Sequence, residues 1–375
     1  MSASEGRVTP DNIEEALGRW LRSPGEKDRV FPKGKKVEVV FLVEAVNALL
    51  LRTEGVEDIT LFKLPGTEYE VPAILPEKLQ AVSRRRMLAY LRRFRDNDPG
   101  KLAVHLKALA EVCTYGKKSG GQSSGVKVGF AKAEETKEKP AEWNCYVQPP
   151  GGDARNATDV GMDGFCPACA LFGAVIDGEK LKGLGNESIG LKSRVEFDPA
   201  VAFLDQEKTV VGYTHNKVAD GVSWTGQGLY MEHHVAPGTV FAGKVTLEDV
   251  TPAELKAFLA TLSAIDRLGG RERLFGGVRV HLVAVRGGSY ETVSALGIAK
   301  KLAERYGGAE YPPGVEEVKR AVVEELGEGF KEVDGEKFRK LVDADETWDS
   351  LWRDTVDYDR QVVERVMGLL GKTCR

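Results

Sequence analysis

Residues 229–282 read LYMEHHVAPGTVFAGKVTLEDVTPAELKAFLATLSAIDRLGGRERLFGGVRVHL, and this stretch decides the expected fold. Two β-rich runs, 229–235 and 239–247, flank a Pro-Gly turn, and a third run at 278–285 follows a loop rich in arginine and glycine. A run with helical spacing lies between them at 251–268. The order strand, strand, helix, loop, strand is typical of an α+β domain with an antiparallel sheet.

The helix in this stretch has a marked beginning and a marked end. Thr251 is a suitable N-cap, Pro252 occupies the first helical position, and Glu254 completes a capping box. Gly269 and Gly270 are the expected end of the helix, because glycine readily adopts the backbone conformation that closes a C-terminus. These paired signals predict a helix over 251–268.

The rest of the chain fits an α+β pattern around this stretch. Its elements include β-rich runs near the N-terminus, a long helical region broken near Asp98, and an acidic helical tail. Their order favours a ferredoxin-like β-α-β-β-α-β core with an antiparallel sheet and large insertions. The expected strands are 35–51, 59–64, 188–197 and 201–211, and the expected helices are 12–22, 76–112, 294–306 and the region from residue 314 onward.

The composition is that of a globular protein with a substantial core. Of the 375 residues, 42% are apolar and 29% are charged. The N-terminus is polar, with no apolar run typical of a signal peptide, and the most apolar stretch, Val37 to Leu51, is interrupted by charged residues. Five cysteines in a chain of this length favour a reducing compartment over a disulfide scaffold. We therefore expect a cytoplasmic protein without a membrane span.

Charge is unevenly distributed along the chain. The formal net charge is −4, which alone argues against nucleic acid as a ligand. Residues 316–375, however, carry 16 acidic and 11 basic residues, whereas residues 78–107 carry nine basic and two acidic ones. The basic segment is a candidate phosphate-binding face. The plainer alternative is an arginine-rich helix that is merely solvated.

Three motifs resemble the RAMP superfamily of CRISPR-associated proteins. The order of elements over 229–282 looks like the C-terminal half of RAMP domains, in which a glycine-rich loop follows the second helix of an RRM-like fold. The run Cys-Pro-Ala-Cys-Ala-Leu-Phe-Gly at 166–173 resembles the CPxCxLFG signature of backbone subunits in that superfamily. Residues 37–47 resemble the first strand of the type I-D backbone protein. The likeness covers most of 30–310 and leaves out the acidic tail.

The resemblance implies a domain plan and a function. It implies an RRM-like core at 30–64 and 188–310, a helical insertion at 76–112, and a zinc-binding and loop insertion at 113–187. The helical extension expected at 311–375 rests on the sequence pattern alone. Relatives stack head-to-tail along a CRISPR RNA, grip its backbone without base specificity, and leave sequence reading to base pairing. The implied partners are guide RNA, single-stranded target nucleic acid, other copies of the chain and other effector subunits, with no membrane.

Four cysteines form a candidate structural zinc site. Cys166 and Cys169 make a C-x-x-C knuckle, and Cys113 and Cys145 lie upstream, with His105 an alternative ligand in place of Cys113. A metal would stabilise a loop region that cannot build a core of its own. Two alternatives remain open: free buried thiols, and a glutaredoxin-like redox pair.

The expected RNA contacts are basic side chains of three segments. On a helix, Arg85, Arg92 and Arg93 share a face, and guanidinium groups bind phosphate oxygens bidentately. Lys192 and Arg194 alternate along an expected strand. The glycines of the 269–277 loop allow close approach to phosphates. The full expected set also contains Arg84, Arg86, Arg271 and Arg273. For each arginine alone, a solvated surface position is the simpler interpretation.

Residues 210–228 are the candidate for a projecting thumb. His215, Lys217 and Trp224 supply the aromatic and basic side chains with which a wedge could separate a base step. The alternative is an ordinary hairpin with Trp224 packed into the core. Type III relatives cleave target RNA with an acidic loop residue, and Asp153, Asp159 and Asp163 are possible counterparts. Type I relatives are scaffolds, so we expect binding without catalysis and assign no catalytic residue.

Overall fold

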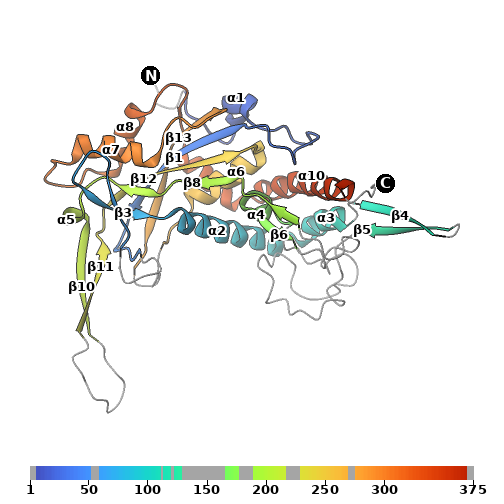
Figure 1. Ribbon diagram of the computed structural model, residues 1–375, viewed down its shortest axis with the longest axis horizontal. Helices are drawn as coiled ribbons and strands as arrows, with labels where there is room; N and C mark the ends of the chain where they lie inside the picture. The colour runs from blue at the N-terminus through green and yellow to red at the C-terminus, as the bar shows by residue number, and fades with distance from the viewer. Residues whose placement is uncertain are drawn as a thin grey trace, which may run out of the picture.

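A computed structural model describes residues 6–51, 59–110, 113–119, 122–128, 165–176, 189–216, 229–268 and 275–369. Within these ranges the chain forms one large sheet, three two-stranded hairpins and a set of helices (Figure 1). No helix in the described ranges has the length and apolar character to cross a bilayer.

The large sheet is antiparallel at every described pairing and has β1 at its centre. β1 pairs with β12 on one side and β13 on the other, so that Val39 faces Val245 and Val285. The strand order is β14-β13-β1-β12-β9-β3-β2, and β8 also pairs with β12. The strands are β1 Lys36–Ala45, β2 Leu61–Lys63, β3 Glu70–Ile74, β8 Val195–Phe197, β9 Ala200–Ala202, β12 Val240–Glu248, β13 Val278–Gly288 and β14 Lys331–Glu332.

The two faces of the sheet are covered by different helices. Alternation along β1 directs Phe41 to one face, where its ring lies 6.2 Å from that of Phe197, which in turn lies 6.1 Å from Phe258 of α6. On this face α2 (Pro76–Asn97) and α6 (Pro252–Ser263) pack against the sheet. The opposite face is contacted by α7 (Ala295–Tyr306) and α8 (Val315–Glu325). The sheet is therefore the middle layer of three.

The start of α6 has the predicted capping box. The Thr251 hydroxyl accepts a hydrogen bond of 3.2 Å from the backbone N–H of Glu254, and the Glu254 carboxylate accepts one of 2.9 Å from the N–H of Thr251. Two of the four N–H groups left open at a helix start are thus satisfied locally. The helix expected over 76–112 is divided into two helices, α2 and α3 (Pro99–Ala110). The break lies at Asp98, which precedes Pro99.

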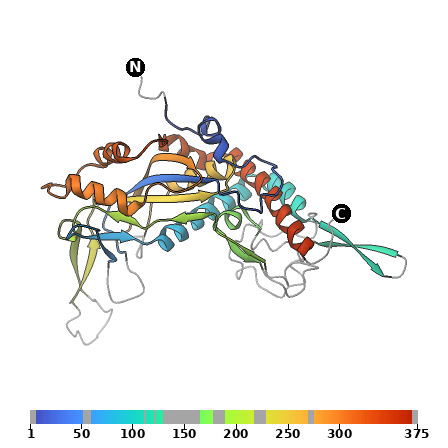
Figure 2. The same cartoon turned by 45° about the horizontal axis from the view of Figure 1, so that its top comes forward.

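The acidic tail is an integral part of the fold. It forms α8, α9 (Gly335–Lys340) and α10 (Asp345–Leu369). α10 packs against α2, α3, α4 and α6, and Figure 2 shows it (red) beside α3. Trp348 and Trp352 of α10 are fully buried. An extension that had no place in the recognised pattern therefore contributes to the core.

Two hairpins project from opposite ends of the molecule (Figure 1). β10 (Val210–Asn216) pairs with β11 (Leu229–Val235), and β4 (Cys113–Ser119) pairs with β5 (Gln122–Val128). The strand expected at 201–211 is instead β9, the short helix α5 (Gln206–Thr209) and the start of β10, because Asp205 caps α5 by accepting a 3.0 Å bond from Glu207. The remaining short elements are α1 Ile13–Leu17, α4 Pro167–Phe172, β6 Ala174–Ile176 and β7 Ile189–Leu191.

Candidate nucleic-acid interface

The two ends of the glycine loop close onto the segment that follows β1. Leu268 donates a 2.8 Å bond to the carbonyl of Gly276, and the N–H of Gly276 donates one of 2.8 Å to Ala48. The amide oxygen of Asn47 accepts a 2.6 Å bond from Gly277. Gly276 has a φ of +89°, and a Cβ there would lie 2.2 Å from the Leu268 carbonyl oxygen, so only glycine fits. We call residues 47–51, 266–268 and 275–277 together the Gly-loop end.

The β10–β11 hairpin begins at the Gly-loop end. Leu49 and Val235 exchange backbone bonds of 3.0 and 2.9 Å, which joins β11 to the segment after β1. The Phe275 ring lies 4.6 Å from that of His234, and the Tyr213 ring meets His234 edge-on at 5.1 Å. Rings from both hairpin strands therefore pack on the residue that ends the glycine loop. The predicted thumb and the predicted glycine loop are neighbours.

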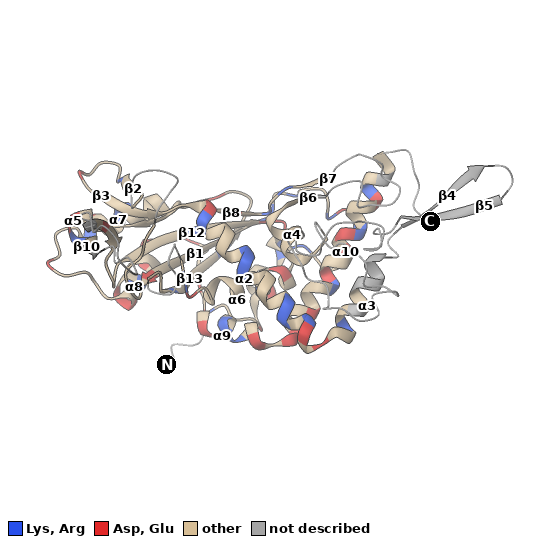
Figure 3. Ribbon diagram, turned by 90° about the horizontal axis from the view of Figure 1, so that it is seen from below, with Lys and Arg blue, Asp and Glu red and all other residues tan. Residues whose placement is uncertain are grey.

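α2 also reaches the Gly-loop end. Arg86 of α2 forms an ion pair with Asp266, which belongs to the Gly-loop end. Its neighbour Arg85 is exposed and makes no ion pair with any described residue. Arg92, seven residues on, lies on the same face of α2 as Arg85. Figure 3 shows the basic residues of α2 beside the acidic residues of the adjoining α10.

Arg93 and Arg84 are directed elsewhere. Arg93 binds the Val342 carbonyl, forms a 2.9 Å ion pair with Asp343, and lies 5.2 Å from the Tyr90 ring. Arg84 donates a hydrogen bond of 3.4 Å to the sulfur of Cys169. The helix expected from 76 onward is present, but the five arginines predicted to bind RNA do not all share one environment, because Arg84, Arg86 and Arg93 have partners in distant parts of the chain.

Lys192 and Arg194 have opposite environments. The side chain of Lys192 is 73% exposed and pairs with Glu248 at 3.3 Å. Arg194 is buried, and its guanidinium bonds to both carboxylate oxygens of Glu254 at 3.0 and 2.5 Å. Both line a cavity of about 270 Å³ together with Arg29 and Arg365. Because Arg194 is fully engaged inside the protein, we do not assign it to an RNA-binding surface.

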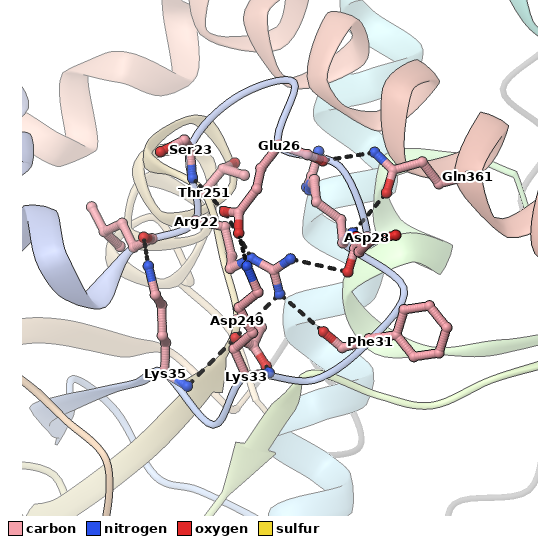
Figure 4. A network of polar contacts seen from close by, with 12 residues as sticks. Arg22, Ser23, Glu26, Asp28, Phe31, Lys33, Lys35, Asp249, Thr251 and Gln361 are labelled. Carbon is pink, nitrogen blue, oxygen red and sulfur yellow. Dashed lines mark hydrogen bonds and ion pairs between the residues drawn. The ribbon is translucent and has the colours of Figure 1, made fainter.

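A loop between the N-terminal helix and β1 is folded around another buried arginine. Arg22 donates to the carbonyls of Phe31 and Asp28, each at 3.1 Å, and to the carboxylate of Glu26 at 3.0 Å (Figure 4). Hydrogen bonding to Lys33 and Arg22 lowers the pKa of Glu26 to about 2 against the opposing effect of burial. Gln361 of α10 accepts from Arg29 and thereby fastens the loop to the acidic tail. This network is structural.

The remaining predicted RNA contacts lie at or beyond the limits of the described residues. The backbone of His215 pairs with Tyr230 in the β10–β11 hairpin. Lys217, Trp224, Arg271 and Arg273 lie outside the described residues, so the structure does not place them.

The C-x-x-C knuckle has a geometry suited to one metal ion. Cys166 and Cys169 are both buried, and their sulfur atoms lie 3.5 Å apart. Two thiolates of a tetrahedral zinc site, each about 2.3 Å from the metal, would lie about 3.8 Å apart, so the pair fits chelation. Cys113 begins β4, and Cys145 lies outside the described residues. His105 has its Nε2 at 2.9 Å from Asp349, and its ring stacks on Trp352.

Comparisons with known proteins agree on one family. A family model described as Csc2 CRISPR matches residues 21–310. The crystal structure of Thermofilum pendens Csc2 is 38% identical, covers 96% of this chain and 98% of that chain, and has a TM-score of 0.70. No curated protein compared with the chain matches it.

Two solved assemblies are more distantly similar. One is a CRISPR RNA-guided surveillance complex in a pre-nicking state, at 13% identity, 78% and 88% coverage and a TM-score of 0.42. The other is a Type IV-B CRISPR complex, at 13% identity, 65% and 90% coverage and a TM-score of 0.35. These likenesses are too weak to indicate a shared function. The family model and the Thermofilum pendens structure each match most of the chain. On this basis, the chain belongs to the Csc2 CRISPR family.

Proposed function

We propose that this protein is a guide-RNA-binding backbone subunit of a CRISPR effector complex of type I-D character. It binds single-stranded RNA through the backbone, without base specificity, and assembles head-to-tail with further copies and with other effector subunits in the cytoplasm. One observation carries the proposal: the Gly-loop end, the base of the β10–β11 hairpin and the arginine-bearing helix α2 meet in one region.

Each of the three parts supplies a different kind of RNA contact. A glycine loop offers backbone N–H groups that approach phosphate oxygens without steric conflict. Exposed arginines such as Arg85 supply charge for sequence-independent binding. A projecting hairpin whose strands carry Tyr213 and the 60% exposed Met231 can separate neighbouring bases. The proposed surface consists of Arg85, Arg86, Arg92, His215, Lys217, Trp224, Arg271 and Arg273. Lys192 is a separate proposed contact, because its partner Glu248 lies at the other end of β12.

We interpret the centre of the fold as a ferredoxin-like, RRM-like unit. Its chain order is β1, α2, β8, β12, α6 and β13, and its sheet order is β13-β1-β12-β8. Antiparallel neighbours and helices on one face fit the split β-α-β arrangement of that unit. α7 and α8 cover the opposite face of the sheet, so RNA bases cannot stack on that face. The proposed RNA path therefore runs past the end of the sheet where the Gly-loop end lies.

We propose a structural zinc ion bound by Cys166, Cys169, Cys113 and Cys145. The close, buried sulfur pair supports the first two ligands. His105 is the alternative to Cys113, because its Nε2 atom is bonded to Asp349 at 2.9 Å and its Nδ1 atom could then bind the metal. Burial of both thiols argues against a redox role, since thiol exchange needs an accessible sulfur.

The scaffold proposal is tested with labelled single-stranded RNA of random sequence, with and without Mg²⁺. A mobility shift without fragments supports a scaffold. Fragments that appear only with Mg²⁺ would support a nuclease, and Asp153, Asp159 and Asp163 would then be substituted one by one. No shift at low salt would contradict RNA binding altogether.

A further inference from the structure

Arg84 joins helix α2 to the cysteine knuckle. Its Nη2 atom lies 3.4 Å from the sulfur of Cys169, and that sulfur lies 3.5 Å from the sulfur of Cys166. Both cysteines are fully buried, whereas Arg84 is half-buried. α2 packs along α4, which carries Cys169, so the contact is between two packed helices.

A buried thiolate centre requires a compensating charge. A zinc ion with four thiolates has a net charge of about −2, and placing such a charge in the protein interior is costly unless donors surround the sulfur atoms. A guanidinium provides both a positive charge and a directed N–H group. Outer donors of this kind orient the ligands and typically alter metal affinity by about 10- to 100-fold.

We propose that Arg84 is a positioning residue of this thiolate centre: it donates to the Cys169 sulfur and retains the metal there. The inference rests on the zinc part of the proposed function. It separates Arg84 from its exposed neighbour Arg85, although both belong to one arginine run. It also gives α2 two roles, because one helix holds the metal knuckle on one side and offers cations to RNA on another.

The test compares R84Q, R84K and R85Q in the full-length protein purified with its metal. Zinc content is measured by mass spectrometry, and zinc release is followed with a chromogenic chelator. We expect R84Q to release zinc about 10-fold faster or more, R84K to lie between R84Q and wild type because it keeps the charge, and R85Q to match wild type. RNA affinity should fall in R85Q and stay within about twofold of wild type in zinc-loaded R84Q.

Equal release rates in R84Q and wild type would overturn the inference, as would a wild-type protein that contains no zinc. The second result would also remove zinc from the proposed function, while RNA binding by the same sample decides the scaffold role separately. If R84Q does not fold, R84K decides: faster release than wild type supports the inference, and an unchanged rate contradicts it.

Discussion

Arg194 and Glu254 form a buried, two-bond ion pair between the β7–β8 turn and the start of α6. The two N–O distances are 3.0 and 2.5 Å. Burial alone would raise the pKa of Glu254, but the guanidinium groups of Arg194 and Arg29 lower it. Arg29 in turn binds Asp354 of α10 at 2.9 Å. The sheet edge, α6, the N-terminal loop and the acidic tail therefore share one ion cluster.

Removal of Arg194 should destabilise the protein without a specific effect on RNA binding. R194A leaves Glu254 buried beside fewer cations, and breaking such a pair typically costs about 3–5 kcal/mol in free energy of unfolding. Urea denaturation measures the loss. The matched control is K192A, whose side chain is exposed and should change stability by less than about 0.5 kcal/mol. Similar stability of R194A and K192A would show that the pair is not required for folding.

The same cluster predicts that stability falls as pH rises through about 6. Burial, with Glu254 nearby, raises the pKa of Asp354 to about 6, and burial raises the pKa of Asp359 well above its usual range. The folded state thus binds these protons more tightly than the unfolded state. Their contribution is full below the unfolded pKa of about 4 and is lost as pH rises through the folded values.

The substitution D359N isolates this effect, because neither carboxylate oxygen of Asp359 has a hydrogen-bond partner among the described residues. The melting temperature of D359N should decline less than that of wild type between pH 5 and about 8. E364Q, at an exposed position of the same helix, is the control and should follow wild type. Parallel curves for D359N and wild type would contradict a buried, protonated Asp359.

Local signals in the sequence predicted much of the fold. β11 has the predicted bounds, because alternation and the Pro-Gly turn are local. The start of α6 was predicted from Thr251 and Glu254, whose capping box uses only neighbouring residues, but its predicted end at Leu268 was wrong, because α6 ends at Ser263. β3 was missed, because Pro72 and the short run around it do not look like a strand in isolation.

The surroundings of charged side chains could not be predicted in the same way. Arg93 meets Asp343, and Arg194 meets Glu254, from residues 250 and 60 positions away in the chain. Helical spacing shows which arginines share a face but not which face is covered by acidic partners. The net charge of the tail likewise does not reveal that Asp354 and Asp359 are buried in it.

Gly276 is the glycine on which the Gly-loop end depends. G276A must place a Cβ against the Leu268 carbonyl oxygen at a positive φ, which alone costs about 1–2 kcal/mol. We expect loss of stability in denaturant and at least a several-fold loss of RNA affinity. G308A is the control, since nothing lies within 4 Å of its Cβ and its φ is ordinary. Wild-type RNA affinity in G276A would exclude this loop from the interface.

The Arg85 and Arg92 face of α2 should carry part of the salt dependence of RNA binding. Each arginine that neutralises a phosphate releases counterions, so R85E/R92E should lower the slope of log affinity against log salt by about one for each lost contact. Affinity at low salt should fall about 10-fold or more. The control R305E/R320E makes the same change in net charge on α7 and α8, at exposed positions outside the proposed surface. Equal slopes in both double variants would mean that net charge alone, and not this helix face, determines binding.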